Sequence, residues 1–155
     1  MKEDACCEAS DLAPAPWLAS HPSPLISLRL AHLAVRRSFR EAFADLDLTP
    51  LNYTIMDTLS RRGRLRQAEL INAVGSLGTS LAEPIDELVA RGWVSRQPDQ
   101  ADRRSNTVAL TDRGHDVFKT LKGRHDVLMA SMLGFVSLEV QEQLLGFLEQ
   151  LSVSA

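Results

Sequence analysis

Hydrophobic residues at helical spacing predict a long first helix from Pro24 to about Leu46. Ser23 precedes this helix, and proline is favoured at the first position of a helix. The apolar residues fall on two sides of the helix, which indicates burial between two partners rather than on one surface. In a chain of this size we expect the second partner to be another subunit. One side carries Leu28, Val35, Phe39, Ala42 and Leu46, and the other carries Ile26, Leu30 and Leu33.

The same pattern predicts three shorter helices in the middle of the chain. Thr49-Pro50 supplies a capping threonine and a first-position proline for the first of them, and a glycine ends each one. We expect the third to begin near Gly78-Thr79-Ser80. The three helices span about 50–62, 67–74 and 79–91, and they are closed by Gly63, Gly75 and Gly92.

Two short apolar runs follow and predict strands at about 94–97 and 107–110. The residues between them are charged, which predicts a hairpin with arginine at its tip. Thr111 then caps a long helix that runs to about Met132, and Ser137 begins a last amphipathic helix. The predicted fold is mainly α with a small two-stranded β-wing, a winged helix-turn-helix with helices added at both ends.

Size and composition predict one ordinary domain preceded by a tail. The chain has 155 residues, of which 45% are hydrophobic and 24% are charged, and this is enough for a hydrophobic core. Residues 1–23 carry scattered prolines and small residues, so we expect a disordered tail ahead of a single domain at 24–155. No apolar run approaches the roughly 18 residues that a membrane helix needs. The expected location is cytoplasmic, with no membrane partner.

Candidate catalytic and metal-binding residues are scattered along the sequence. Cys6 and Cys7 are adjacent, and neighbouring cysteines neither bridge each other well nor make a zinc site, so we interpret them as incidental thiols rather than a redox sensor. The histidines follow no metal-ligand spacing, and neither a nucleophile motif nor a glycine-rich phosphate loop occurs. We therefore expect no enzyme and no bound metal or cofactor. The histidines are His21, His32, His115 and His125.

The net charge of −3 argues against a protein that coats nucleic acid indiscriminately, but it does not argue against a sequence-specific binder. The charge is distributed unevenly. Between Arg61 and Arg113 there are nine arginines and seven acidic residues, whereas the first eleven residues and the stretch after Gly114 are acidic. We interpret the centre of the chain as a basic module.

The charged hairpin carries a further pattern. Asp102 and Arg104 are followed by an alternating strand and then by Leu110-Thr111. This order resembles the wing of the multiple antibiotic resistance regulator (MarR) family. The resemblance covers about residues 25–150 and is strongest from Leu48 to Phe118.

The resemblance implies a homodimer that binds DNA. In that family the helices at both ends interlock, here 24–46 and 112–155, and the winged module, here 48–111, reads half of a palindromic operator. The implied function is a sequence-specific, DNA-binding transcriptional regulator, a repressor that a small aromatic, phenolic or anionic ligand releases. The alternative is a dimeric winged-helix adaptor that binds a ligand or a protein and has weak or lost DNA binding.

Helix-turn-helix geometry places the start of the third middle helix in the major groove. Thr79 and Ser80 can bond phosphates or bases there, and Glu83 can accept a hydrogen bond from a cytosine amino group. The alternative role of the two hydroxyl residues is to cap the helix. One departure from the family pattern is that no arginine or lysine occurs between Arg66 and Arg91, and Glu83 is followed by Pro84. We therefore expect the operator to be read more by the wing and by DNA shape, and weak DNA binding is the other outcome of this departure.

At the wing, Asp102 lies two residues before Arg104 and can hold its guanidinium in one pose. The resemblance implies that Arg104 enters the minor groove, where a narrow A·T tract deepens the negative potential. The alternative is a charged hairpin that is simply solvated. The expected phosphate contacts are Arg64, Arg66, Arg96 and Arg103.

A row of cations on the first helix is a candidate effector site. The row consists of Arg29, His32, Arg36 and Arg40, whose spacing of three and four residues puts them on one side of the helix. Unpaired cations do not stay buried, so the row either pairs with acids or faces a cleft that binds an anion. The resemblance implies the second, and the alternative is intersubunit salt bridges to acids such as Glu41 or Asp45. The candidate effector-binding residues are Arg29, His32, Arg36, Tyr53 and Met56.

Overall fold

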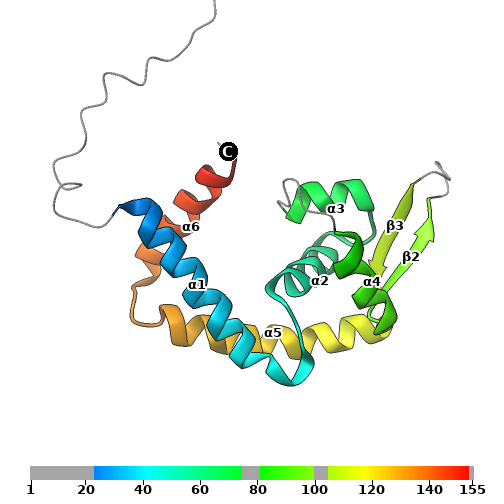
Figure 1. Cartoon of the computed structure of the whole chain (residues 1–155), viewed down its shortest axis with the longest axis horizontal. Helices are drawn as coiled ribbons and strands as arrows, with labels where there is room; N and C mark the ends of the chain where they lie inside the picture. Colours follow the sequence, from blue (N-terminus) through cyan, green and yellow to red (C-terminus); the bar gives the residue numbers. More distant parts are fainter. Residues whose placement is uncertain (1–22, 75–80, 100–104, 154–155) are drawn as a thin grey trace, which may run out of the picture. The chain divides into compact units, whose positions relative to one another are not determined.

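The structure is a computed structural model that describes residues 23–74, 81–99 and 105–153 (Figure 1). Two compact units divide within the first helix, after Val35. Across these described residues, no helix is long and apolar enough to span a membrane. In chain order the elements are α1 (Pro24–Ala42), the 3₁₀ helix η3 (Ala44–Leu46), α2 (Pro50–Arg62), β1 (Leu65–Arg66), α3 (Gln67–Val74), α4 (Ala82–Ala90), β2 (Val94–Pro98), β3 (Asn106–Leu110), α5 (Asp112–Leu133) and α6 (Leu138–Val153).

α2 begins and ends where the sequence predicts. The Thr49 side chain accepts a hydrogen bond from the backbone N–H of Asn52 (3.1 Å), and Pro50 occupies the first helical position. Gly63 ends the helix with a φ of +74°, a conformation that favours glycine. α3 also has its predicted bounds.

The core of the second unit is built around α2. This helix packs against α3, α4, α5 and β3. The side chains at these contacts are among the most buried of the chain, as expected for apolar faces that meet in one core. They include Ile55, Met56, Leu59, Leu70, Ile85, Leu88, Val108 and Leu121.

The sheet of the described residues has three strands rather than the two expected. Its order is β1-β3-β2, and both neighbouring pairs are antiparallel. β2 and β3 pair from Val94 opposite Leu110 to Pro98 opposite Asn106, so each is one residue longer than predicted. β1 has only two residues, which is too short for any polarity pattern, and its pairing with β3 alone defines it.

The turn between α4 and β2 follows the predicted glycine signal. Gly92 has a φ of +70°, and the N–H groups of Gly92 and Trp93 donate to the carbonyls of Val89 and Leu88 at 2.9 and 3.0 Å. This is the Schellman arrangement that ends many helices. The first turn of α5 packs on the same corner, because a Cβ on Gly114 would lie 1.9 Å from the Trp93 carbonyl oxygen.

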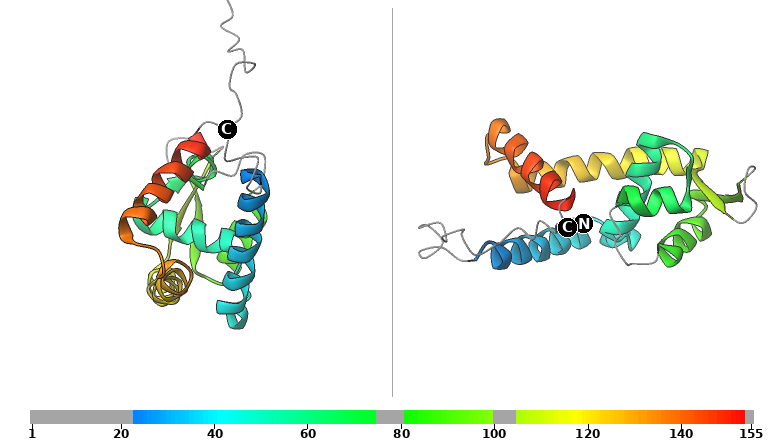
Figure 2. Two further views of the ribbon diagram at one scale, coloured as in Figure 1. Left: turned by 90° about the vertical axis from the view of Figure 1, so that its left-hand side faces the viewer. Right: turned by 90° about the horizontal axis from the view of Figure 1, so that it is seen from above.

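α5 begins at its predicted cap, where the Thr111 side chain accepts a hydrogen bond from the Gly114 N–H (2.9 Å). It ends at Leu133, one residue beyond the prediction. Figure 2 shows α5 as one uninterrupted helix that leads from the sheet to α6. At 1.5 Å per residue it is about 33 Å long.

Two predicted helix starts and ends are wrong. α1 ends at Ala42 rather than near Leu46, because the chain tightens into η3 and Asp47 then turns it with a φ of +45°. α4 begins at Ala82, after the buried Leu81, which makes no side-chain cap. Thr79 and Ser80, considered as capping residues, lie outside the described residues, so their capping role stays a prediction.

Apolar side chains of α1 and α6 remain exposed in the single chain. Only Phe39 is buried in α1, and Leu25 is 76% exposed. In α6, Phe147 is 54% exposed. The expected burial of the first helix on two sides is therefore not found among the described residues. Further exposed apolar residues are Ile26, Leu30, Leu33, Leu138, Leu144, Leu145, Leu148 and Leu151.

Candidate nucleic-acid interface

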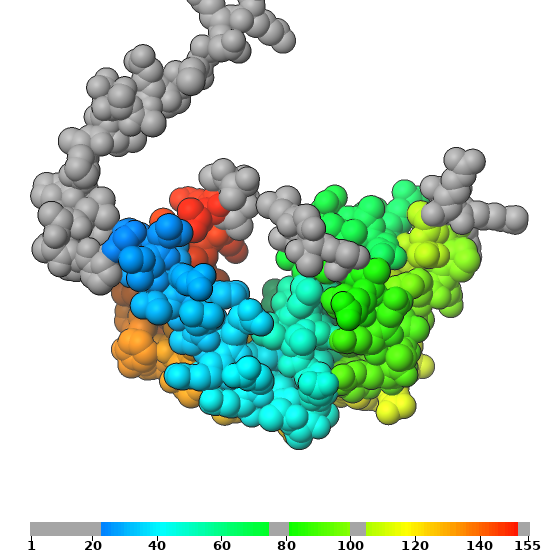
Figure 3. Space-filling model, in the orientation of Figure 1, coloured from blue at the N-terminus to red at the C-terminus, as the bar shows by residue number. Residues whose placement is uncertain are grey.

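α4 and the strands of the wing form one surface. α4 packs against β2, which follows it directly in the chain, and the space-filling view shows their side chains in contact (Figure 3). α4 is the second helix of the helix-turn-helix and is called the recognition helix below. Pro84 occupies its third position, where a backbone N–H has no partner within the helix, so the proline costs no helical hydrogen bond.

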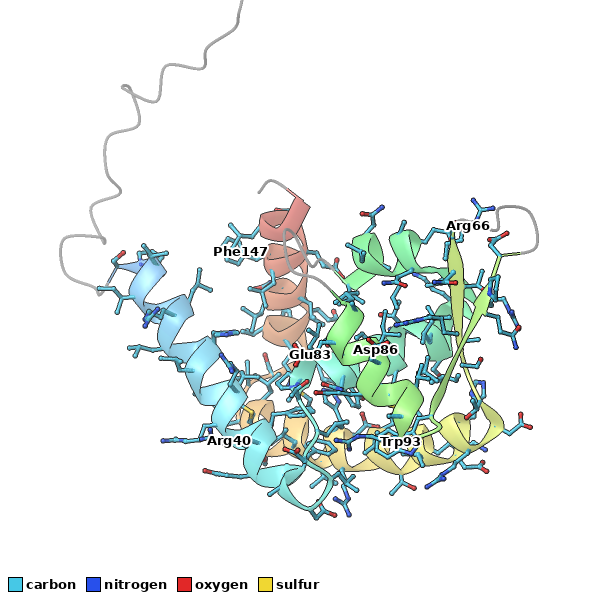
Figure 4. The ribbon with its side chains drawn as sticks, turned by 45° about the vertical axis from the view of Figure 1, so that its right-hand side comes forward. Arg40, Arg66, Glu83, Asp86, Trp93 and Phe147 are labelled. Carbon is cyan, nitrogen blue, oxygen red and sulfur yellow. The ribbon has the colours of Figure 1, made fainter. Side chains whose placement is uncertain are left out.

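The recognition helix carries three acidic residues, and two of them hold it in place. Asp86 Oδ1 lies 2.7 Å from Arg96 Nη2 on β2. Glu87 Oε2 accepts a hydrogen bond from the side-chain amide of Asn52 (3.0 Å), which is 1% exposed and needs a partner. Glu83 accepts no hydrogen bond and forms no ion pair with any residue of the described ranges, and its side chain is exposed. Figure 4 shows Glu83 and Asp86 on this helix.

Arg96 therefore has a structural role beside the phosphate contact expected from the sequence. Its side chain is 28% exposed, and its ion pair joins the recognition helix to the wing. A guanidinium that already faces a carboxylate adds less to the neutralisation of phosphates. The phosphate contact of Arg96 stays a prediction.

Arg64 and Arg66 lie beside the end of the wing sheet. Arg64 Nη1 donates to Gln97 Oε1 (3.1 Å) and to Thr107 Oγ1 (3.4 Å). Arg66 Nε donates to the carboxylate of Asp99 (2.8 Å), which is 9% exposed (Figure 4 labels Arg66). Both arginines stay substantially exposed, so they can approach phosphates while they brace the wing. Arg64, Gln97, Pro98, Asp99 and Thr107 line a polar pocket of about 390 Å³.

Five predicted DNA contacts lie outside the described residues. They are Thr79, Ser80, Asp102, Arg103 and Arg104. Their roles stay predictions that rest on the sequence.

Arg91, at the end of the recognition helix, is a residue that the sequence analysis did not single out. Its guanidinium donates to the backbone carbonyls of Leu46 and Asp47, the second at 3.1 Å. It also lies 5.2 Å from the centre of the Trp93 ring. Arg91 thus ties the recognition helix to the segment between α1 and α2. The available signal was an arginine at a helix end, where cations interact favourably with carbonyls.

Asp45 is already paired within the chain. Arg124 Nη1 on α5 lies 2.7 and 2.8 Å from its two carboxylate oxygens, and this hydrogen bond holds the pKa of Asp45 below its usual value. The alternative in which Asp45 balances the cationic row of α1 is therefore not favoured. An apolar pocket of about 580 Å³ lies beside Arg124, lined by Ala42, Gly123, Val127, Leu128 and Ser131.

The cationic row itself is exposed. Arg29 and His32 lie in the first unit and Arg36 and Arg40 in the second, each on the surface. The ion pairs of the described residues include none of these four side chains. An exposed row is compatible with either of the two roles that the sequence leaves open.

Tyr53 and Met56 are more deeply buried than a pocket wall usually is. Met56 is fully buried in the core, and Tyr53 is 8% exposed. The Tyr53 ring stacks on His125 at 4.5 Å between ring centres and lies 5.7 Å from Phe118. Burial raises the pKa of Tyr53 to about 12. Contact of these two residues with an effector stays a prediction, and for Met56 it requires the core to open.

Comparison with known proteins decides the family. The sequence profile of the MarR family matches residues 46–105, from the end of η3 into the wing. The transcriptional regulator HosA of Escherichia coli is 34% identical over 96 residues, which are 62% of this chain and 71% of HosA. The chain belongs to the MarR family. The regulator PecS of Dickeya dadantii is 28% identical over 102 residues, which are 64% of this chain, and the match spans 61% of the length of PecS.

Solved structures of this family have the same fold. BpsR of Bordetella bronchiseptica, whose DNA binding is regulated by 6-hydroxynicotinic acid, has a TM-score of 0.74 at 21% identity, over 89% of this chain and 98% of BpsR. The transcriptional repressor CouR, bound to a 23-mer DNA duplex, has a TM-score of 0.72 at 23% identity, over 90% of this chain and 98% of CouR. The predicted winged-helix fold class is confirmed. HosA and PecS are transcriptional regulators, which confirms that this MarR-family member is a regulator rather than an enzyme.

Proposed function

We propose that this regulator is a homodimeric repressor that binds a palindromic DNA operator and is released by a small aromatic, phenolic or anionic ligand. The observation that carries the proposal is the Asp86–Arg96 pair, which fastens the recognition helix to the base of the wing. Insertion of a helix in one groove and a hairpin in the next requires the two elements to keep one relative orientation. CouR, which has the same fold, is a repressor with DNA bound.

Affinity in this proposal comes from arginines on the wing side. The recognition helix has a net negative charge, so phosphate neutralisation falls mainly to Arg64 at the sheet and to Arg103 and Arg104 in the hairpin. Arg66 adds less, because its guanidinium already faces the carboxylate of Asp99. The minor-groove contact of Arg104 then contributes to sequence preference through groove width.

Dimerisation in this proposal uses the uncovered apolar faces of the end helices. α1 carries four arginines and one glutamate, whereas α6 carries three glutamates and no cation. Opposite charges beside exposed apolar residues suit contact between α1 of one subunit and α6 of another. Pairing with α6 of the partner subunit also provides acids for the cationic row.

The ligand acts by linkage. A ligand that binds more tightly to a dimer conformation with separated wings opposes DNA binding, and only by that difference in affinity. The exposed cations of α1 suit a carboxylate or phenolate, and BpsR is regulated by an aromatic acid. A coupling of roughly 1–3 kcal/mol would weaken DNA binding about 5–150-fold.

The test is a binding titration of the purified protein with duplexes from the region upstream of its own gene, across a salt series. We expect a palindromic site to be bound tightly and Arg104→Ala to lose about 1–3 kcal/mol at that site. Arg103→Ala should weaken binding to all sequences and lower the salt slope by about 1. Lys119→Ala is the matched control. Lys119 is 79% exposed on α5, and the substitution removes one positive charge away from the hairpin.

The outcome distinguishes the two functions that the sequence allows. Specific binding that depends on Arg104 supports the repressor. Absence of specific binding at low salt, by a protein that is folded and dimeric, would instead support the adaptor, because an acidic recognition helix repels phosphate. Addition of 6-hydroxynicotinic acid or salicylate to the bound complex then tests the ligand.

A further inference from the structure

The acidic residues of the recognition helix differ in their contacts. It contains Glu83, Asp86 and Glu87 and no cation. Asp86 is paired with Arg96 at 2.7 Å, and Glu87 is bonded to the buried Asn52 at 3.0 Å. These two acids orient the helix on the wing and on α2. A carboxylate without such a partner, on a helix that must approach a polyanion, requires another explanation.

Glu83 is that carboxylate. It occupies the second position of the recognition helix, it is exposed, and no described residue donates to it or forms an ion pair with it. Asp86 and Glu87 lie three and four residues further along the helix, towards the wing and α2. In helix-turn-helix proteins the residues near the start of the second helix contact the base edges. Figure 4 labels Glu83 at this end of the helix.

We infer that Glu83 selects a cytosine in each operator half-site by accepting a hydrogen bond from the exocyclic amino group of that base. This inference rests on the proposed DNA-binding function. A carboxylate has only acceptors, so it needs a donor at the base edge. Cytosine presents an amino group in the major groove, whereas guanine presents two acceptors and thymine presents an acceptor and a methyl group. Adenine also presents an amino group, but its N7 acceptor lies beside that group and repels a carboxylate.

The preference for cytosine arises from repulsion of the other bases as much as from the hydrogen bond to cytosine. When the helix enters the groove, Glu83 loses water, and an unpaired carboxylate in that position is costly. A guanine or thymine at the same position places an acceptor against the carboxylate and adds repulsion. The absence of arginine from the recognition helix then removes the usual contact to guanine, so the half-site differs in base preference from one that arginine reads.

Selection of bound sequences from a randomised duplex library tests the inference on the full-length protein. We expect wild type to enrich a fixed cytosine, and to bind that site about 5–150-fold more tightly than the same site with the C·G pair replaced by T·A. Glu83→Ala should lose this preference, and Glu83→Gln should move it towards adenine, which glutamine can pair with bidentately. Asp116→Asn removes the same charge from α5, where Asp116 is 79% exposed, and should keep the cytosine.

An atomic substitution isolates the hydrogen bond. The selected cytosine is replaced with 2-pyrimidinone, which lacks the exocyclic amino group, and binding is measured with wild type and with Glu83→Ala. We expect this replacement to weaken binding by wild type and to leave the affinity of Glu83→Ala nearly unchanged. The variant already lacks the carboxylate that accepts the hydrogen bond from the amino group. Equal losses for the two proteins would overturn the inference, as would selection of the same base by Glu83→Ala. Failure of wild type to enrich any sequence would be different, because it would overturn the proposed DNA-binding function itself.

Discussion

Tyr53 is the only tyrosine of the chain, so its ionisation can be followed without interference. It is 8% exposed and lies against Phe118 and His125. Burial, reinforced by the negative charges of Asp57 and Asp126, raises its pKa to about 12. We expect the tyrosinate absorbance of the native protein to titrate near pH 12, and that of the denatured protein near 10.

The same shift makes the free energy of unfolding depend on pH. The folded state favours the neutral phenol, so this contribution to stability is fully present below pH 10 and is lost as the pH rises through about 12. Tyr53→Phe should therefore be less sensitive to alkali than wild type, and Asp57→Asn should lower the midpoint of the native titration. A native midpoint near pH 10 would contradict the burial of Tyr53.

At the scale of elements, two glycines of α5 have opposite surroundings. A Cβ on Gly114 would lie 1.9 Å from the Trp93 carbonyl oxygen, whereas a Cβ on Gly123 would meet nothing within 4 Å. We expect Gly114→Ala to lower the free energy of unfolding by about 1–3 kcal/mol, because backbone atoms must shift. Gly123→Ala should leave it unchanged or raise it by up to about 1 kcal/mol, because alanine is the better helix former. Urea unfolding of both variants checks this, and equal shifts would rule out tight packing of α5 on the corner.

Elements that carry their own start and stop signals were predictable from the sequence. α2 and α5 begin at threonine caps, and a glycine stops α2. β1 was not predictable, because its two residues are a strand only through β3, about forty residues later in the chain. The early end of α1 has a similar cause, since the carbonyls of Leu46 and Asp47 face Arg91.

The candidate interface was also only partly predictable from the sequence. Its arginines are visible as charge in the sequence, but their partners are not, because Arg96 meets Asp86 and Arg66 meets Asp99 only after the wing has formed. The sequence shows three acidic residues in the recognition helix. It does not show that two of them orient the helix and that Glu83 does not. Sequence reasoning therefore predicted a charged surface, and only the structure shows which partner each described side chain contacts.

At the scale of the whole molecule, the end helices expose more apolar surface than a monomer needs. Scattered apolar residues are normal on a protein surface, but contiguous ones mark an interaction site. On α6 the positions of Leu144, Phe147, Leu148 and Leu151 share one side of the helix, and all four are at least 40% exposed. The proposed homodimer explains this side, because a symmetric interface buries it twice.

Phe147→Glu should therefore dissociate the dimer. Phe147 is 54% exposed, so a partner can cover about half of its side chain, which is worth about 1 kcal/mol in each subunit. Two copies of the substitution would weaken association by at least about 2 kcal/mol, or roughly 30-fold, before the cost of burying a charge is added. Gly146→Glu adds the same charge on the opposite side of α6, where a Cβ would meet nothing within 4 Å, and should stay dimeric. Sedimentation equilibrium of the two variants decides between the alternatives, because a Phe147→Glu protein with the mass and dissociation constant of wild type would place the interface elsewhere.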